Sequence, residues 1–365
     1  MNGVLRLPEI LSRRDMAARD LEDAVTLPGY AYADPAFHGF ERDCIFARTW
    51  QLVGRADQLR EAGDHVVAEV ADKPVIAVRG SDGVLRGFFN VCRHRAGPLA
   101  LENGNTPQLR CKYHGWTYTL EGQLRSAHEM DGARDFDVSC IHLEPVQVAE
   151  WEGFVFAAAG KPAMELEELM AGIRARIQPA DLSKMRFQVR DTYDIECNWK
   201  AYVDNYLEGY HLPHVHPGLN RLLDYRSYDT YLSKWHSWQH SPLDGDCGPY
   251  QAGEAYYYFL WPNLMLNILP DRLQVNQVVP LSQRRCRVIF DYFYIDTDSE
   301  AARDAIQADR EFSDEVQKED VAICERVQKG LESGSYRAGR LSPKRESGVH
   351  HFQELVRAAW HEAAQ

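Results

Sequence analysis

Short apolar runs separated by turn residues characterise the chain from Trp50 to about Phe156. Runs such as HVVAEV, KPVIAVRG and GFVFAA are rich in β-branched and aromatic residues and are bounded by Gly, Asp and Pro. Such runs are typical of β-strands joined by tight turns. The pattern therefore predicts an all-β module of about 100 residues in the first half of the chain.

The pattern changes after this module. Residues 163–177 favour a helix, aromatic strand-like runs follow at 256–269 and 287–295, and the C-terminal part is mostly helical. At 365 residues the chain exceeds the usual size of one hydrophobic core, so we expect two domains. The order of elements predicts an α+β fold in which the β-module is inserted near the start of a larger domain.

We expect three segments along the chain. Residues 1–44 would form a helical segment that packs on the larger domain, residues 45–157 would form the β-module, and residues 158–365 would form the larger domain.

Composition and charge narrow the class of protein. Hydrophobic residues make up 45% of the chain and charged residues 26%, which is ordinary for a globular protein. The net charge of -13 would repel a phosphate backbone, so we expect no nucleic-acid partner. The N-terminus lacks the apolar core of a signal peptide. The longest apolar stretch, residues 259–269, is interrupted by Pro262, Asn263 and Asn267 and is too short to span a membrane. We expect a cytoplasmic protein without a membrane partner.

Four residues form a metal-binding motif within the β-module. Cys92 and His94 are separated by one residue, Cys111 and His114 by two, and sixteen residues lie between the pairs. In one kind of [2Fe-2S] cluster two cysteines hold one iron and two histidines hold the other, which fits this set. A zinc finger pairs cysteine with cysteine and histidine with histidine, whereas each pair here is mixed. We interpret the other six cysteines as small buried hydrophobic residues.

A second cluster of metal-binding side chains lies at residues 198–219, which contain three histidines and two carboxylates. Asp204, Glu208 and His211 follow one another at i, i+4 and i+7 and would share a helix face. Pro213 should end that helix just after His211.

His214 and His216 would then lie in the turn after the helix. Two histidines from this segment, together with a distant carboxylate, would form the 2-His-1-carboxylate site of enzymes that activate oxygen at ferrous iron.

The third ligand is sought in the predicted helix 312–331. Its apolar stripe has helical periodicity and consists of Phe312, Val316, Ile323, Val327 and Leu331. Asp320 falls inside this stripe, where a carboxylate is costly unless it is paired or binds a metal. Pairing with an arginine, or a helix edge drawn wrongly, is the alternative for Asp320. Glu315 and Glu319 fall outside the stripe, and we expect them to be solvated.

The two motifs together resemble those of Rieske non-haem iron oxygenase α-subunits. The first is C-x-H-x16-C-x2-H, and the second, N-W-K…D-N-Y-x-E-x-Y-H-x4-H, is most similar to the branch of choline, carnitine and glycine betaine monooxygenases. The resemblance implies a Rieske [2Fe-2S] domain and a helix-grip-type catalytic domain with a central antiparallel sheet.

The same resemblance assigns roles to residues of the second motif. It implies that His211, His216 and Asp320 bind Fe(II), and that Glu208 bridges the two metal sites. Asp204 and Asn205 would lie close to the iron ligands. His214 matches no ligand position of the family, although His211 and His214 are spaced like a metal-binding pair and remain an alternative.

The family further implies how electrons reach the iron. O2 is the co-substrate, and the cluster of one subunit serves the iron of its neighbour in a homotrimer. Glu208 would connect His94 or His114 of the neighbouring subunit with His211. We find no Gly-rich dinucleotide fingerprint in the chain. A separate flavin and iron-sulfur reductase, or a ferredoxin, would therefore pass on electrons from NAD(P)H.

The sequence identifies the substrate less directly than it identifies the metal ligands. Residues 235–261 are rich in aromatic rings, and we select Trp235, Tyr258 and Trp261 as candidate pocket residues. Rings can bind a quaternary ammonium group through cation-π contacts, which contribute about 2 kcal/mol; they could also hold an arene, or simply pack the strands. The resemblance to the choline, carnitine and glycine betaine branch implies hydroxylation next to nitrogen in a quaternary amine or betaine, leading to N-demethylation or an aldehyde. Hydroxylation of an aromatic ring is the alternative. A Rieske protein that only carries electrons or senses redox state is a third.

Overall fold

The computed structural model describes residues 7–219, 229–243 and 253–365. Contacts divide the chain into two units. One comprises Arg42–Leu166, and the other comprises Met1–Glu41 together with Glu167–Gln365. Each unit is described by itself below.

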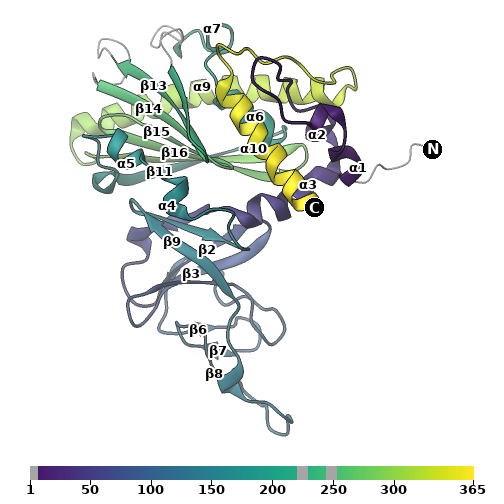
Figure 1. Ribbon diagram of the computed structural model, residues 1–365. Helices are drawn as coiled ribbons and strands as arrows, with labels where there is room; N and C mark the ends of the chain where they lie inside the picture. Colours follow the sequence, from purple (N-terminus) through teal and green to yellow (C-terminus); the bar gives the residue numbers. More distant parts are fainter. Residues whose placement is uncertain (1–6, 220–228, 244–252) are drawn as a thin grey trace. The chain divides into compact units, whose positions relative to one another are not determined.

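The unit at 42–166 is built almost entirely of antiparallel strands (Figure 1). Its larger sheet has the order β1-β10-β9-β4-β3-β2-β5, and a smaller sheet has the order β6-β7-β8. The strands are β1 (Gln51–Arg55), β2 (Asp64–Val70), β3 (Lys73–Arg79), β4 (Leu85–Phe89), β5 (Gly104–Asn105), β6 (Leu109–Arg110), β7 (Thr117–Tyr118), β8 (Leu124–Ser126), β9 (Pro145–Trp151) and β10 (Phe154–Ala158). The predicted all-β module is confirmed.

The second unit contains a seven-stranded antiparallel sheet of order β11-β17-β16-β15-β14-β13-β12 (Figure 1). The strands are β11 (Arg186–Ile195), β12 (Asp229–Leu232), β13 (His236–Leu243), β14 (Gly253–Leu260), β15 (Leu264–Ile268), β16 (Arg272–Ser282) and β17 (Arg285–Tyr294). The predicted central antiparallel sheet of an α+β domain is therefore confirmed.

The helices lie mainly in the second unit. They are α1 (Leu7–Leu11), α2 (Tyr30–Ala33), α3 (Pro35–Cys44), α4 (Leu166–Leu169), α5 (Ile173–Arg176), α6 (Trp199–Tyr206), α7 (Leu212–Val215), α9 (Glu300–Glu332) and α10 (Ser347–Ala364). The side chain of Asn198 caps α6 by accepting from the N–H of Lys200, and Ser299 caps α9 in the same way. Among the described residues, no helix is both long enough and apolar enough to cross a membrane.

The helix predicted to run through His211 ends earlier. α6 stops at Tyr206, and the backbone N–H groups of Tyr210 and His211 donate to the carboxylate of Glu208. Pro213 lies in the first turn of a new helix, α7, where its missing N–H costs no hydrogen bond. The prediction that Pro213 ends the first helix was therefore wrong. His214 lies within α7, and His216 follows its last residue.

The apolar stripe predicted for α9 is displaced from its most buried face. The buried residues are Ile306, Asp309, Gln317, Cys324 and Gln328, whereas Val327 of the predicted stripe is 45% exposed. Polar partners explain the difference. Tyr202 donates to Oε1 of Gln317 at 2.7 Å, and the Asn198 N–H donates to Oε1 of Gln328 at 2.9 Å. Hydrogen-bonded amides can be buried at little cost.

Candidate metal centres

Two tight loops of the β-unit present the predicted cluster ligands. The Cys92 N–H donates to the carbonyl of Gly97 at 2.8 Å, and the Cys111 N–H donates to that of Trp116 at 2.8 Å. Each cysteine carbonyl in turn accepts from a residue four positions later, Ala96 or Gly115. The two halves of the motif therefore have the same local backbone, although they are far apart in sequence.

The side chains of these loops are arranged with sulfur inside and imidazole outside. Cys92 and Cys111 are buried, whereas His94 and His114 are exposed. The two imidazole rings lie 4.7 Å apart, and His94 stacks on Trp116. In a cluster held by these four residues, the iron bound by the two cysteines would lie toward the core. The two histidines would lie toward solvent, where an electron-transfer partner could approach.

Hydrogen bonds and close packing suit a cluster at this place. The Tyr118 hydroxyl lies 3.2 Å from Sγ of Cys92, and the Tyr113 N–H donates to Sγ of Cys111 at 3.4 Å. Such donors tune the potential of an iron-sulfur centre. A Cβ on Gly97 would lie 2.9 Å from Sγ of Cys111 and 2.7 Å from Cβ of Tyr113. The loop therefore has no room for any larger residue at this position.

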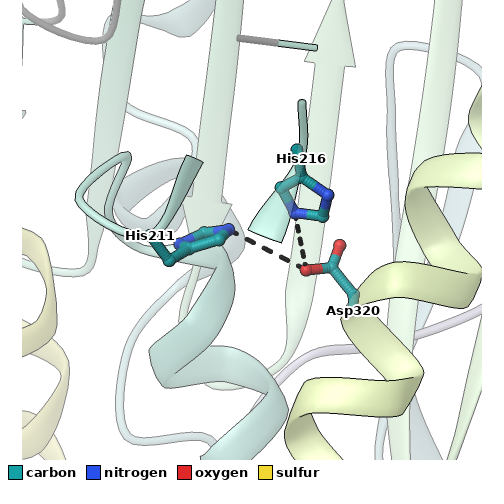
Figure 2. A group of neighbouring side chains, drawn as sticks. All are labelled: His211, His216 and Asp320. Atoms are coloured by element: carbon teal, nitrogen blue, oxygen red, sulfur yellow. Dashed lines mark hydrogen bonds and ion pairs between the residues drawn. The ribbon is translucent and has the colours of Figure 1, made fainter. Parts of the chain in front are cut away.

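The second unit brings His211, His216 and Asp320 together (Figure 2). One ligand atom of each lies within 4.8 Å of the other two. Oδ1 of Asp320 is 3.0 Å from Nε2 of His216 and 3.8 Å from Nε2 of His211. These three residues could hold a ferrous ion in the manner of a 2-His-1-carboxylate site. His214 is exposed and lies outside this group.

Each imidazole of this group is oriented by a carboxylate. Oε1 of Glu208 lies 2.7 Å from Nδ1 of His211, and Oε2 of Glu319 lies 2.7 Å from Nδ1 of His216. Both rings can therefore donate Nδ1–H outward and keep the Nε2 lone pair for a metal. The expectation that Glu319 is a solvated charge was wrong, because its side chain is 31% exposed and contacts His216. Glu315 is exposed, as predicted.

Asp204 and Asn205 are neighbours in sequence but point to different places. Nδ2 of Asn205 donates to Oδ1 of Asp320 at 2.6 Å. The carboxylate of Asp204 instead accepts from the Tyr32 hydroxyl and from Nε2 of Gln353. Asn205 thus touches the candidate iron ligands, whereas Asp204 does not, which corrects the expectation for Asp204.

A cavity of about 160 Å³ adjoins the candidate iron site. His211, His216 and Asp320 line it, together with rings and amides that come from the sheet and from helices α6 and α9. The rings are Tyr202, Tyr206, Tyr257, Phe290 and Phe312, and the amides are Asn205, Gln239, Asn267, Gln274, Asn276 and Gln317.

The three aromatic residues selected for the pocket lie elsewhere. Tyr258 is buried on the opposite face of β14, beneath Arg176, and Trp261 packs on Phe352 of α10. Trp235 is also not among the residues that line the cavity. Side chains alternate along a strand, so in the run Tyr256–Phe259 it is Tyr257 that reaches the cavity. Periodicity alone could not decide which face this would be.

Comparisons with known proteins establish the family. The Rieske [2Fe-2S] domain matches residues 49–142, and the catalytic domain of the ring hydroxylating alpha subunit matches residues 182–362. The chloroplastic choline monooxygenase of Arabidopsis thaliana is 38% identical over 352 residues, which are 92% of this chain and 83% of that protein.

A bacterial relative and a solved structure support the same family. The carnitine monooxygenase oxygenase subunit of Escherichia coli (strain K12) is 31% identical over 359 residues, which are 92% of this chain and 94% of that protein. A quaternary ammonium Rieske monooxygenase, solved in a study of carnitine oxidation, superposes with a TM-score of 0.84 at 27% identity, over 93% of this chain and 96% of the other. The chain belongs to the Rieske oxygenase α-subunits and is an oxidoreductase with a Rieske [2Fe-2S] domain.

Proposed function

We propose that this chain is the oxygenase component of a Rieske system that hydroxylates a quaternary amine at a carbon next to nitrogen. The reaction would combine the substrate with O2, two electrons and two protons, and would release the hydroxylated product and water. A product hydroxylated on an N-methyl group breaks that C–N bond and gives formaldehyde, a tertiary amine and a proton. One hydroxylated on the carbon of the longer chain that is next to nitrogen breaks that C–N bond and gives an aldehyde, a tertiary amine and a proton.

We assign the two metal centres to the residues described above. Cys92, His94, Cys111 and His114 would hold the cluster, and His211, His216 and Asp320 would hold ferrous iron, which supplies oxygen activation when bound. Asn205 holds the carboxylate of Asp320 by its hydrogen bond, and Glu208 and Glu319 hold the imidazoles. These contacts fix the three side chains before any substrate enters.

The composition of the cavity carries the proposal for the substrate. Its rings suit a quaternary ammonium group, which is attracted to aromatic faces and needs no hydrogen bond. Arg272 is the one Arg or Lys among the described residues that line the cavity, and it forms an ion pair with Asp309. The described part of the cavity wall therefore offers an anionic substrate no unmatched cationic side chain. The names of the relatives, choline and carnitine monooxygenases, support the same class.

Partners follow from the family. We propose a homotrimer in which Glu208 connects His211 with the cluster of a neighbouring subunit, and a separate reductase that delivers electrons from NAD(P)H. The Escherichia coli relative is called an oxygenase subunit, which supports a division of labour with another protein.

A turnover screen tests the proposed function. Purified holoenzyme with a surrogate reductase would be given choline, carnitine, several betaines, and a set of arenes and benzoates. We expect oxygen uptake and product formation with at least one quaternary amine and with none of the arenes. Formaldehyde would mark attack on an N-methyl group, and an aldehyde of the longer chain would mark attack there.

A further inference from the structure

Two amide side chains of the cavity have unused hydrogen-bonding capacity. Gln317 and Asn276 are 2% and 4% exposed, and both line the cavity beside the candidate iron site. Among the described residues, neither Nε2 of Gln317 nor Oδ1 of Asn276 has a hydrogen-bond partner. A buried polar atom without a partner is unfavourable, so such atoms commonly meet a ligand or an ordered water.

The position of Gln317 places its amide close to the reacting end of the cavity. It precedes Asp320 by three residues in α9, so both side chains lie on nearly the same face of the helix, about 4.5 Å apart along its axis. The Tyr202 hydroxyl donates to Oε1 of Gln317 at 2.7 Å. This bond fixes the orientation of the amide and leaves Nε2 as a donor.

Asn276 reaches the cavity from the sheet. It lies in the middle of β16, where it pairs with Met265 of β15 and Phe290 of β17. Its neighbours on the same strand face, Arg272 and Gln274, are already occupied, because Arg272 donates to Gln274 at 2.7 Å and Gln274 donates to Ser313 at 3.3 Å. Asn276 therefore presents an amide that is held on a rigid strand and is available to a ligand.

A donor and an acceptor together suit a hydroxyl group. A hydroxyl can accept from one amide and donate to the other, whereas a carboxylate can only accept. Among the described residues that line the cavity, a carboxylate would also find no unmatched cation, since the charge of Arg272 is matched by Asp309.

We propose that Gln317 and Asn276 bind a hydroxyl group of the substrate, which is therefore a quaternary amino alcohol. This inference rests on the proposed function and specifies its substrate. The hydroxyl is held between α9 and β16, and the ammonium group lies among the rings. The two contacts together set which carbon faces the iron ligands.

Substrate pairs that differ by one oxygen test the inference. Choline would be compared with ethyltrimethylammonium, and carnitine with γ-butyrobetaine, by calorimetric binding to the anaerobic holoenzyme and by oxygen uptake. The pair that contains the better substrate decides the test. In that pair we expect the alcohol to bind at least about tenfold more tightly than its deoxy analogue.

Variants of Gln317 and Asn276 then test whether these two amides cause the preference for the alcohol. Gln317→Met and Asn276→Leu keep the shape but remove the hydrogen bonds. Each should weaken binding of the alcohol by about tenfold and change binding of the deoxy compound by less than about twofold. Gln307→Met, at an exposed position of the same helix, should change neither.

Two results would overturn the inference while leaving the proposed function intact. One is wild-type enzyme that binds alcohol and deoxy analogue equally, and the other is a pair of variants that weaken both ligands alike. If no quaternary amine bound or was oxidised at all, the proposed function would fail, and this assignment of Gln317 and Asn276 with it.

Discussion

Glu319 holds the imidazole of His216 from the side opposite Asp320. Its Oε2 lies 2.7 Å from Nδ1, while Oδ1 of Asp320 lies 3.0 Å from Nε2 of the same ring. The two carboxylates are adjacent in α9, so one turn of helix both orients a ligand and supplies one. Glu208 and His211 repeat this arrangement on the other side of the site.

Removal of Glu319 should therefore weaken metal binding without removing a ligand. Partners of this kind typically contribute 10- to 100-fold in metal affinity, so Glu319→Ala should bind Fe(II) roughly tenfold or more weakly. Titration of metal-depleted enzyme with Fe(II) would measure this. Glu315→Ala, an exposed glutamate of the same helix, serves as the matched control. Equal affinities of the two variants would show that Glu319 does not orient His216.

Removal of Asp320 should eliminate the second metal site alone. The wild-type chain should contain about three irons, two in the cluster and one at the mononuclear site. Asp320→Ala should contain about two and retain the visible spectrum of the cluster. Iron analysis combined with absorption spectroscopy makes the comparison. A wild-type chain with only about two irons would favour a pure electron carrier.

The structure explains why sequence reasoning reached Asp320 but not Glu319 or Gln317. A carboxylate within an apolar stripe stands out because its burial needs a reason, whereas Glu319 next to it fits a solvated face. The contact of Glu319 with His216 depends on the path of the chain after α6, and the helical pattern predicted that path wrongly. The loops that carry the two cysteines of the cluster motif are short, so the prediction for this motif does not depend on the path of the chain elsewhere.

The close packing of the two cysteine loops leads to a prediction for Gly97. Alanine here would bring Cβ within 2.9 Å of Sγ of Cys111, so the two cysteine loops could not close around a cluster. Gly97→Ala should be isolated with little or no Rieske absorption and should retain only its mononuclear iron. Gly39→Ala is the matched control, because a Cβ at this position would meet no atom within 4 Å. Gly83→Ala is unsuitable, because the positive φ of Gly83 would strain an alanine. Normal cluster content in Gly97→Ala would contradict the close packing described.

His236 makes stability depend on pH in a defined direction. Burial is the main reason why the pKa of this histidine is lowered from 6.5 to about 4. The hydrogen bond with the carbonyl of Leu169 opposes this shift, and the charges of Arg176 and His351 add to it. The unfolded chain takes up the proton near pH 6.5, so the stabilisation is complete above that pH and is lost as the pH falls toward 4.

Between pH 7.5 and 5.5 this one group should remove about 1 kcal/mol from the free energy of unfolding. Urea unfolding at the two pH values would measure the loss in the wild type and in His236→Gln. The variant should show a correspondingly smaller change with pH. Identical changes in both proteins would mean that His236 keeps an ordinary pKa when folded.

Coupling between oxygen uptake and product is the most direct test of the proposed activity. Holoenzyme with a reductase and choline or carnitine would be followed with an oxygen electrode, and the products would be identified by mass spectrometry. We predict one product molecule, oxidised next to nitrogen, for each O2 consumed in a well-coupled reaction, and no product with Asp320→Ala. Oxygen uptake that is stimulated by an arene and by no quaternary amine, with a hydroxylated ring as product, would contradict the proposal.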